Sequence, residues 1–417
     1  MTRRAKPVVL VVIDGLTPSM LEATGTPALR FLLEHGSYRR ALSAFPSLTP
    51  VCLASIATGA HPDVHGIPHL VWWNRGEERL VEYGSSFAAL RAAGLARGIR
   101  DTIVNLNERH LSKRAQTIYE ALEDEGLTTA AINITTYRGR TRHLSTIPGA
   151  PAVNGPKRFF FYSLYESDAT GAPLAVLNRA LGSIDAYAAA VGRWLVTRDG
   201  FDLLVFYLPD YDFASHALGP DAAHEALARA DASIAALFAA AGGPDEFLER
   251  YAVVLCSDHG QTHVERAARL VVAGARVTAS NRAAMVYGDD PRALAAALDG
   301  EPSVGVAAFL DGGRLVARRA GEEDVALLDE FPGGAERMAA ALRNPNAGEV
   351  LVSAADGWEF VDLAGRHHIG GGSHGSLAGS DSEVPMLTVG LGPPPASITG
   401  IKRLLLEHFE AGVSRAA

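Results

Sequence analysis

The chain has 417 residues, of which 48% are hydrophobic and 20% are charged, and its formal net charge is −9. A chain of this length and composition can bury a large core, and the negative charge excludes binding of nucleic-acid polymers through a basic face. Its only two cysteines, Cys52 and Cys256, stand in apolar surroundings, so we expect buried free thiols and no disulfide framework.

The first residues give no sign of a targeting or anchoring segment. Residues 2–6 are basic, but the apolar run that follows them is interrupted by Asp14 and has no cleavage signature. We therefore expect no signal peptide, no membrane-spanning segment, no stable membrane anchor and a cytoplasmic location.

Three short apolar runs are typical of strands, and each leads to a carboxylate. Continuous Val, Leu and Ile bounded by Gly, Pro and Asp indicate strands that are buried on both faces. The runs and the residues that follow them are 7–13 with Asp14, 202–208 with Asp212 and His216, and 251–256 with Asp258 and His259. In an open α/β sheet, ligands bind beyond the carboxyl ends of the strands. We therefore expect these side chains to meet in one crevice.

A loop with two prolines, residues 45–50, precedes an Ala-rich apolar run at 51–58 that is typical of a helix. Pro50 suits the first turn of this helix, because its missing N–H is not needed there, and Thr49 is expected at the N-cap. Thr49 either only caps the helix or also acts in a site, since a helix N-terminus favours phosphate oxygens.

The remaining patterns alternate between helix and strand. Helices are predicted at 27–35, 116–125, 175–196, 222–241, 291–298 and 398–411, and strands at 128–134, 284–287, 349–353 and 385–389. This alternation predicts one α/β domain over residues 1–417, with a doubly wound, mainly parallel sheet flanked by helices. We expect insertions at about 68–173 and 264–366 to cap the active site.

The recurring Asp and His residues indicate a metal site. Six candidates are gathered from distant parts of the chain: Asp14, Asp212, His216, Asp258, His259 and His374. A mixed Asp and His set suits zinc better than calcium or magnesium, which prefer oxygen ligands. Six ligands are too many for one tetrahedral ion and enough for two. Any one Asp could merely cap a helix, but capping does not explain why Asp and His recur together.

Four motifs in this order resemble a known enzyme family. They are Asp14-Gly15, Phe45-Pro46-Ser47-Leu48-Thr49-Pro50 followed by His65-Gly66-Ile67, Asp212-Phe213-Ala214-Ser215-His216-Ala217-Leu218-Gly219-Pro220, and Ser257-Asp258-His259-Gly260 with a later Ser373-His374-Gly375-Ser376. Together they resemble the nucleotide pyrophosphatase/phosphodiesterase branch of the alkaline phosphatase superfamily. The resemblance extends from residue 8 to about residue 390.

The resemblance implies a two-zinc hydrolase, with other divalent transition metals as alternatives. Asp14, Thr49, Asp258 and His259 would hold one ion, and Asp212, His216 and His374 the other. Thr49 would be the nucleophile, and the resulting phosphothreonine would be hydrolysed by a water on the second ion. The implied substrate is a small-molecule phosphodiester or pyrophosphate, with nucleotides among the candidates.

The chain departs from the family pattern where relatives carry an Asn that donates to the phosphoryl oxygen. His69 and Asn74 are the two candidates for this role, and the choice between them stays open. Trp72 and Trp73 are candidates to contact the second substituent of a diester. Two further groups could face the crevice, a basic one at Arg138, Arg140, Arg142 and His143, and an aromatic one at residues 159–162. Both also fit ordinary surface or core positions.

Other reactions share this fold and metal set. A phosphomonoesterase or a lipid-phosphate hydrolase is the main alternative, and a catalytically silent binding protein is the other. No Arg lies in residues 45–59, where a monoester dianion would require additional positive charge, so a diester is favoured.

Overall fold

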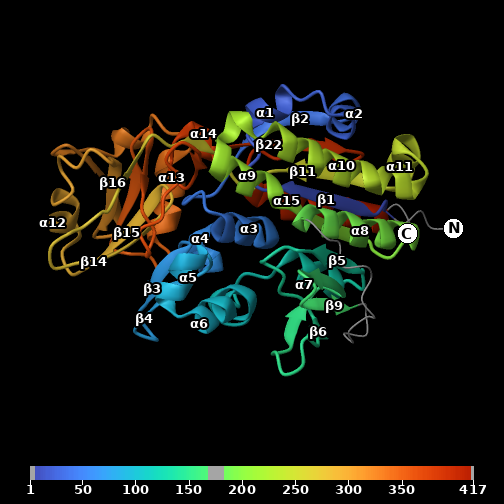
Figure 1. Ribbon diagram of the computed structural model, residues 1–417, viewed down its shortest axis with the longest axis horizontal. Helices are drawn as coiled ribbons and strands as arrows, with labels where there is room; N and C mark the ends of the chain where they lie inside the picture. The colour runs from blue at the N-terminus through green and yellow to red at the C-terminus, as the bar shows by residue number, and fades with distance from the viewer. Residues whose placement is uncertain (1–4, 168–182, 415–417) are drawn as a thin grey trace.

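The computed structural model describes residues 5–167 and 183–414. Its main sheet has eight strands in the order β2-β22-β11-β1-β10-β5-β8-β9 (Figure 1). The strands are β1 (Val8–Ile13), β2 (Ser37–Leu42), β5 (Thr129–Ile132), β8 (Arg158–Phe161), β9 (Tyr165–Ser167), β10 (Leu203–Leu208), β11 (Ala252–Cys256) and β22 (Glu383–Val389). From β11 to β8 all neighbours pair in parallel, whereas β2, β22 and β9 are antiparallel to their neighbours. The predicted mainly parallel α/β sheet is confirmed.

Helices cover both faces of this sheet, as the buried apolar strands require. One face is covered by α1 (Pro18–Glu22), α2 (Pro27–His35), α8 (Ile184–Thr197), α10 (His224–Ala241) and α11 (Pro244–Arg250), and the other by α3 (Thr49–Thr58), α7 (Ile118–Asp124) and α15 (Ile401–Ser414). Successive residues of β1 point alternately into these two cores. The helix predicted at 27–35 has the predicted ends, the other predicted helices are present with shifted ends, and residues 175–182 of one of them lie outside the described residues.

A second, antiparallel sheet is built from the chain between β11 and His374. Its order is β14-β15-β19-β16-β17-β18, and it stands at one end of the molecule beside the main sheet (Figure 1, left). Its elements are β14 (Arg276–Ser280), β15 (Ala283–Tyr287), α12 (Pro291–Ala296), β16 (Val304–Asp311), β17 (Arg314–Arg319), β18 (Glu322–Glu323) and β19 (Val350–Ala354). The strands predicted at 284–287 and 349–353 therefore belong to this second sheet.

The segment predicted as an insertion at about 68–173 is only partly outside the main sheet. It contains a hairpin and helices, but also β5, β8 and β9, because its buried apolar runs at 129–132 and 158–161 extend the parallel sheet from β10. The range predicted for this insertion, about 68–173, is therefore too wide. The parts outside the main sheet are β3 (Val71–Asn74), β4 (Arg79–Glu82), α5 (Phe87–Ala93), α6 (Leu95–Arg100), the π-helix η1 (Asp101–His110), β6 (Thr141–His143) and β7 (Val153–Gly155).

Short elements complete the described chain. They are α4 (Pro62–His65), α9 (Asp210–Leu218), η2 (Pro220–Ala222), β12 (Thr262–His263), β13 (Arg266–Ala268), η3 (Val325–Leu328), α13 (Gly334–Leu342), β20 (Trp358–Phe360), β21 (Gly372–Ser373), α14 (Gly379–Ser382) and η4 (Ile398–Gly400). Cys52 and Cys256 are buried free thiols, as predicted. Within residues 5–167 and 183–414, no helix has the length and apolar character needed to cross a membrane. The cytoplasmic location stays a prediction.

Candidate active site

The side chains predicted as metal ligands lie together at the carboxyl ends of three neighbouring strands. Asp14 follows β1, α9 carries Asp212 and His216 after β10, and Asp258 and His259 follow β11. Thr49 opens α3, and His374 follows β21. The adjacency of β11, β1 and β10 in the sheet is what gathers residues that are far apart in the sequence.

The first group surrounds the Nε2 atom of His259. This atom lies 3.1 Å from Thr49 Oγ1, 3.2 Å from Asp14 Oδ1 and 3.4 Å from Asp258 Oδ2. The two aspartates and His259 could hold one metal ion. Thr49 Oγ1 lies close enough to contact the same ion.

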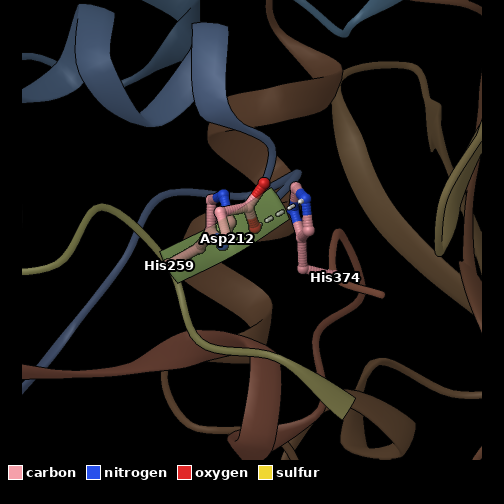
Figure 2. A group of neighbouring side chains, drawn as sticks. All are labelled: Asp212, His259 and His374. Carbon is pink, nitrogen blue, oxygen red and sulfur yellow. Dashed lines mark ion pairs between the residues drawn. The ribbon is translucent and has the colours of Figure 1, made fainter. Parts of the chain in front are cut away.

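The second group surrounds Asp212. Its Oδ2 lies 3.2 Å from His216 Nε2, and its Oδ1 lies 3.9 Å from His374 Nε2. Figure 2 shows how Asp212, His259 and His374 face one another, and these three could also hold an ion. The rings of His259 and His374 stack with their centres 3.6 Å apart, so the two groups adjoin.

Each of the three histidines is oriented by the backbone. The Nδ1 atoms of His216, His259 and His374 lie 2.8, 3.0 and 2.8 Å from the carbonyl oxygens of Gly372, Gly260 and Ser47. A neutral histidine that donates from Nδ1 keeps the lone pair of Nε2 for a metal ion. All three Nε2 atoms face the carboxylates, as a metal site requires.

Two buried carboxylate oxygens are suited to bind a cation. Apart from their charge contacts with His259 Nε2, Asp14 Oδ1 and Asp258 Oδ2 have no hydrogen-bond partner, although such atoms are almost always satisfied. Burial raises the pKa of Asp258 well above its usual value, and the Asp14 carboxylate adds to the rise. Burial alone would lower the pKa of His259, but Asp258 and Asp14 outweigh it and raise it to about 10. Divalent cations would neutralise this concentrated negative charge.

A shell of polar groups holds the carboxylates in place. Tyr207 donates its hydroxyl to Asp14 Oδ2, and Gln261 donates its amide to Asp212 Oδ1. The Ser215 hydroxyl donates to Gln261 Oε1 at 2.6 Å, so it supports the Asp212 ligand through Gln261. Gly15 has φ +69°, and a side chain there would meet Gln261 and Asp212.

The loop that carries His374 is anchored by a buried ion pair between the two sheets. Arg282 Nη1 lies 2.9 Å from Asp381 Oδ1, and neither side chain has exposed surface. The other oxygen of Asp381 accepts from the backbone and hydroxyl of Ser376 at 2.8 and 2.7 Å. The Arg282 backbone N–H also donates to the His374 carbonyl at 2.8 Å.

Asp381→Ala is expected to lower the free energy of unfolding by about 3–5 kcal/mol, because Arg282 would keep a buried charge without its partner. Asp356→Ala is the matched control: Asp356 lies 3.9 Å from Arg282 Nη2, but its side chain is 98% exposed, so a change within about 1 kcal/mol is expected. Urea unfolding of both variants measures the difference. Equal stability of the two variants would contradict this role of the buried pair.

A cavity of about 530 Å³ opens beside the two groups. Its polar floor includes Asp14, Thr49, Asp212, His216 and His374. The other wall is largely apolar and aromatic, and includes Leu70, Tyr83, Ile103, Leu106, Phe161, Tyr162, Leu164 and Phe213. The described lining contains no Lys or Arg. The aromatic segment predicted at 159–162 thus contributes its last two residues to the cavity, while Phe159 and Phe160 are buried in the cores.

The residues predicted to bind substrate do not line this cavity. His69 is buried and bonds through its two ring nitrogens to the backbone of Ala283 and Val71. Asn74 accepts from two backbone N–H groups of the turn after β3. Trp72 is buried, and Trp73 lies under the Arg276 guanidinium, 3.3 Å from the ring centre. The hairpin packs against β14. His69 and Trp73 contact the second sheet, whereas Asn74 bonds within its own turn and Trp72 packs against His110. All four side chains are thus engaged away from the cavity.

The basic cluster at 138–143 does not face the cavity either. Arg138 is buried and bonds to Glu120 and to three backbone carbonyls, and Arg140 pairs with Asp124 and Glu120. Arg142 is exposed, and His143 is buried. None of the four lines the cavity.

Among the cavity residues that were not found from the sequence, two lie beside the metal-site histidines. His368 stacks on His216 with ring centres 4.2 Å apart, and its Nδ1 lies 3.0 Å from a Glu359 carboxylate oxygen. The only feature of the sequence that marks His368 is its closeness to His374. Asn281, between β14 and β15, carried no signal, because its position depends on how the second sheet docks.

The start of α3 differs from the predicted one. Leu48, and not Thr49, is the N-cap residue, and no side chain caps this helix. The Thr49 hydroxyl is directed to His259 instead. The interpretation that Thr49 only caps the helix is therefore wrong.

A family model matches residues 8–377, and its description is type I phosphodiesterase/nucleotide pyrophosphatase. The chain belongs to this family. It is therefore a hydrolase of the phosphodiesterase type within the alkaline phosphatase superfamily. A search of curated protein sequences finds no significant match.

Solved structures share the fold. Murine ectonucleotide pyrophosphatase/phosphodiesterase 5 superposes with a TM-score of 0.65 and 15% identity, covering 97% of this chain and 95% of that one. Phosphonoacetate hydrolase from Sinorhizobium meliloti 1021, in complex with phosphonoformate, gives a TM-score of 0.63 and 20% identity, covering 100% and 97%. An inactive variant of the murine protein is described in complex with AMP, with a TM-score of 0.64, 16% identity and coverage of 97% and 95%.

Proposed function

We propose that this member of the family hydrolyses phosphodiesters at a two-zinc site, with Thr49 as the nucleophile. The observation that supports this most is the position of Thr49 Oγ1, which lies 3.1 Å from His259 Nε2 and is not used to cap α3. Asp14, Thr49, Asp258 and His259 would hold one ion, and Asp212, His216 and His374 the other. Other divalent transition metals fit the same donors.

In the proposed reaction, Thr49 Oγ1 attacks phosphorus in line with the leaving oxygen, the bond from phosphorus to that oxygen breaks, and Thr49 becomes phosphorylated. The hydroxyl proton of Thr49 is released, and the departing alcohol takes up a proton. The N-terminus of α3 favours the negative charge of the phosphoryl group. The bound ions would lower the pKa of the Thr49 hydroxyl and offset charge on the phosphoryl and leaving oxygens. A water then attacks the phosphothreonine and frees Thr49.

The cavity walls favour a substrate with one phosphoryl group and an apolar or aromatic substituent. Without Lys or Arg in the described lining, the cavity offers no side-chain cation for a second phosphate. Phe161, Tyr162 and Phe213 offer rings against which a flat group could pack. The AMP complex of the murine neighbour supports a nucleotide-like substituent here.

The zinc-loaded protein is expected to prefer bis-p-nitrophenyl phosphate over p-nitrophenyl phosphate by at least about tenfold in kcat/KM, since a diester monoanion needs less positive charge than a monoester dianion. A panel that adds ATP and a nucleoside p-nitrophenyl phosphate distinguishes pyrophosphate cleavage from diester cleavage. A preference for the monoester would favour the phosphomonoesterase or lipid-phosphate alternative. No turnover of any ester by metal-loaded protein would favour a silent binding protein.

A further inference from the structure

Asn281 lies at the junction of the second sheet with the active-site cavity. It is 5% exposed and lines the cavity. Its backbone is in the left-handed region, with φ +56°, which Asn tolerates better than most residues. The Asn281 carbonyl accepts from the Phe360 N–H at 2.6 Å. The backbone at this position is thus held by the neighbouring strand.

The amide of Asn281 has a defined orientation. Ser280 Oγ donates to Asn281 Oδ1 at 2.8 Å. The Nδ2 atom therefore points the other way, and it lies 3.3 Å from His374 Nε2. A neutral donor from the second sheet is aimed at the atom through which His374 would bind a metal ion.

Metal binding would remove the acceptor that Asn281 now has. His374 Nδ1 bonds to the Ser47 carbonyl at 2.8 Å, so Nε2 carries the only lone pair available. Once that lone pair is given to an ion, the Asn281 N–H is a buried donor that needs another acceptor. The non-bridging oxygens of a phosphoryl group beside Thr49 are the acceptors that the reaction brings into this space.

We propose that Asn281 Nδ2 donates a hydrogen bond to a non-bridging oxygen of the substrate phosphoryl group. The proposal rests on the proposed function above. It assigns the oxygen-donor role to a residue of the second sheet, after His69 and Asn74 are found to be engaged elsewhere. A neutral amide suits the single negative charge of a diester. The Tyr207 hydroxyl, which also lines the cavity, is already committed to Asp14.

The test compares Asn281→Gly with Asn74→Gly. Glycine keeps the left-handed backbone available at position 281 and removes only the amide. In zinc-loaded protein, calorimetry with inorganic phosphate should show about tenfold weaker binding for Asn281→Gly, as expected for loss of one hydrogen bond to a charged group. Zinc content by elemental analysis should equal that of the wild type. Asn74→Gly should leave phosphate affinity and zinc content unchanged. Ser280→Ala frees the Asn281 amide to rotate and should weaken phosphate binding by a smaller factor than Asn281→Gly.

Two results would overturn the proposal. One is phosphate affinity in Asn281→Gly equal to that of the wild type. The other is a loss of zinc that accounts for the weaker binding, because Asn281 would then act on His374 and not on the substrate. A wild-type protein that holds zinc but does not bind phosphate would instead overturn the proposed function and this assignment together.

Discussion

Thr49→Ala is expected to raise the barrier to turnover by roughly 4–7 kcal/mol, or about 10³- to 10⁵-fold in kcat. The physical reason is that the hydroxyl beside His259 is the only group proposed to attack phosphorus, and alanine has no atom to replace it. The variant should still fold, because Thr49 makes no capping bond in α3. Steady-state kinetics with bis-p-nitrophenyl phosphate measures the effect.

Thr49→Ser is the matched control, because it keeps the hydroxyl and removes only a methyl group. Part of the activity should survive, and both variants should melt close to the wild type. Turnover of Thr49→Ala near the wild-type rate would show that water attacks phosphorus directly, and the covalent mechanism would then be wrong.

The second large effect is expected from the carboxylates and histidines of the two groups. Asp14→Ala should mainly empty the ion position formed with Asp258 and His259, and His374→Ala should mainly empty the position formed with Asp212 and His216. Either change should reduce kcat by about 10³-fold or more, because each ion is proposed to offset charge on a different side of the phosphoryl group. Elemental analysis and kinetics on the same preparations measure the two effects.

Asp221→Ala serves as the control for the loss of one negative charge, because Asp221 is exposed in the short turn after α9. It should retain full metal content and activity. Retention of both metal equivalents in Asp14→Ala and His374→Ala would contradict the assignment of these side chains as ligands.

Five of the seven side chains near the metal groups could be placed together from the sequence because their position follows from one local rule. Buried parallel strands end at the same edge of a sheet, so Asp14, Asp212 and Asp258 had to be close once the three runs were recognised as strands. Thr49 and His374 stand outside those strands: a helix-start pattern indicated Thr49, the recurrence of Asp and His indicated His374, and the family motifs implied their roles. The central sheet and most of its helices followed from the same alternating patterns.

The substrate side of the cavity could not be found in this way. Trp72 and Asn74 follow the nucleophile motif closely in sequence, but the direction of their hairpin is set by its packing against β14. Asn281 reaches the cavity through the docking of the second sheet beside the first, and His368 through its contacts with His216 and Glu359. Both outcomes depend on contacts between segments distant in sequence, which hydrophobic periodicity does not encode.

Two metal ions are proposed to lie between Thr49 and the Asp and His groups. Anomalous diffraction at the zinc absorption edge, on crystals of the zinc-loaded protein, would locate them. Two peaks are expected, one among Asp14, Thr49, Asp258 and His259 and one among Asp212, His216 and His374, about 3.5–4 Å apart as in other two-metal sites. A single peak, no peak, or peaks away from these residues would contradict the proposal.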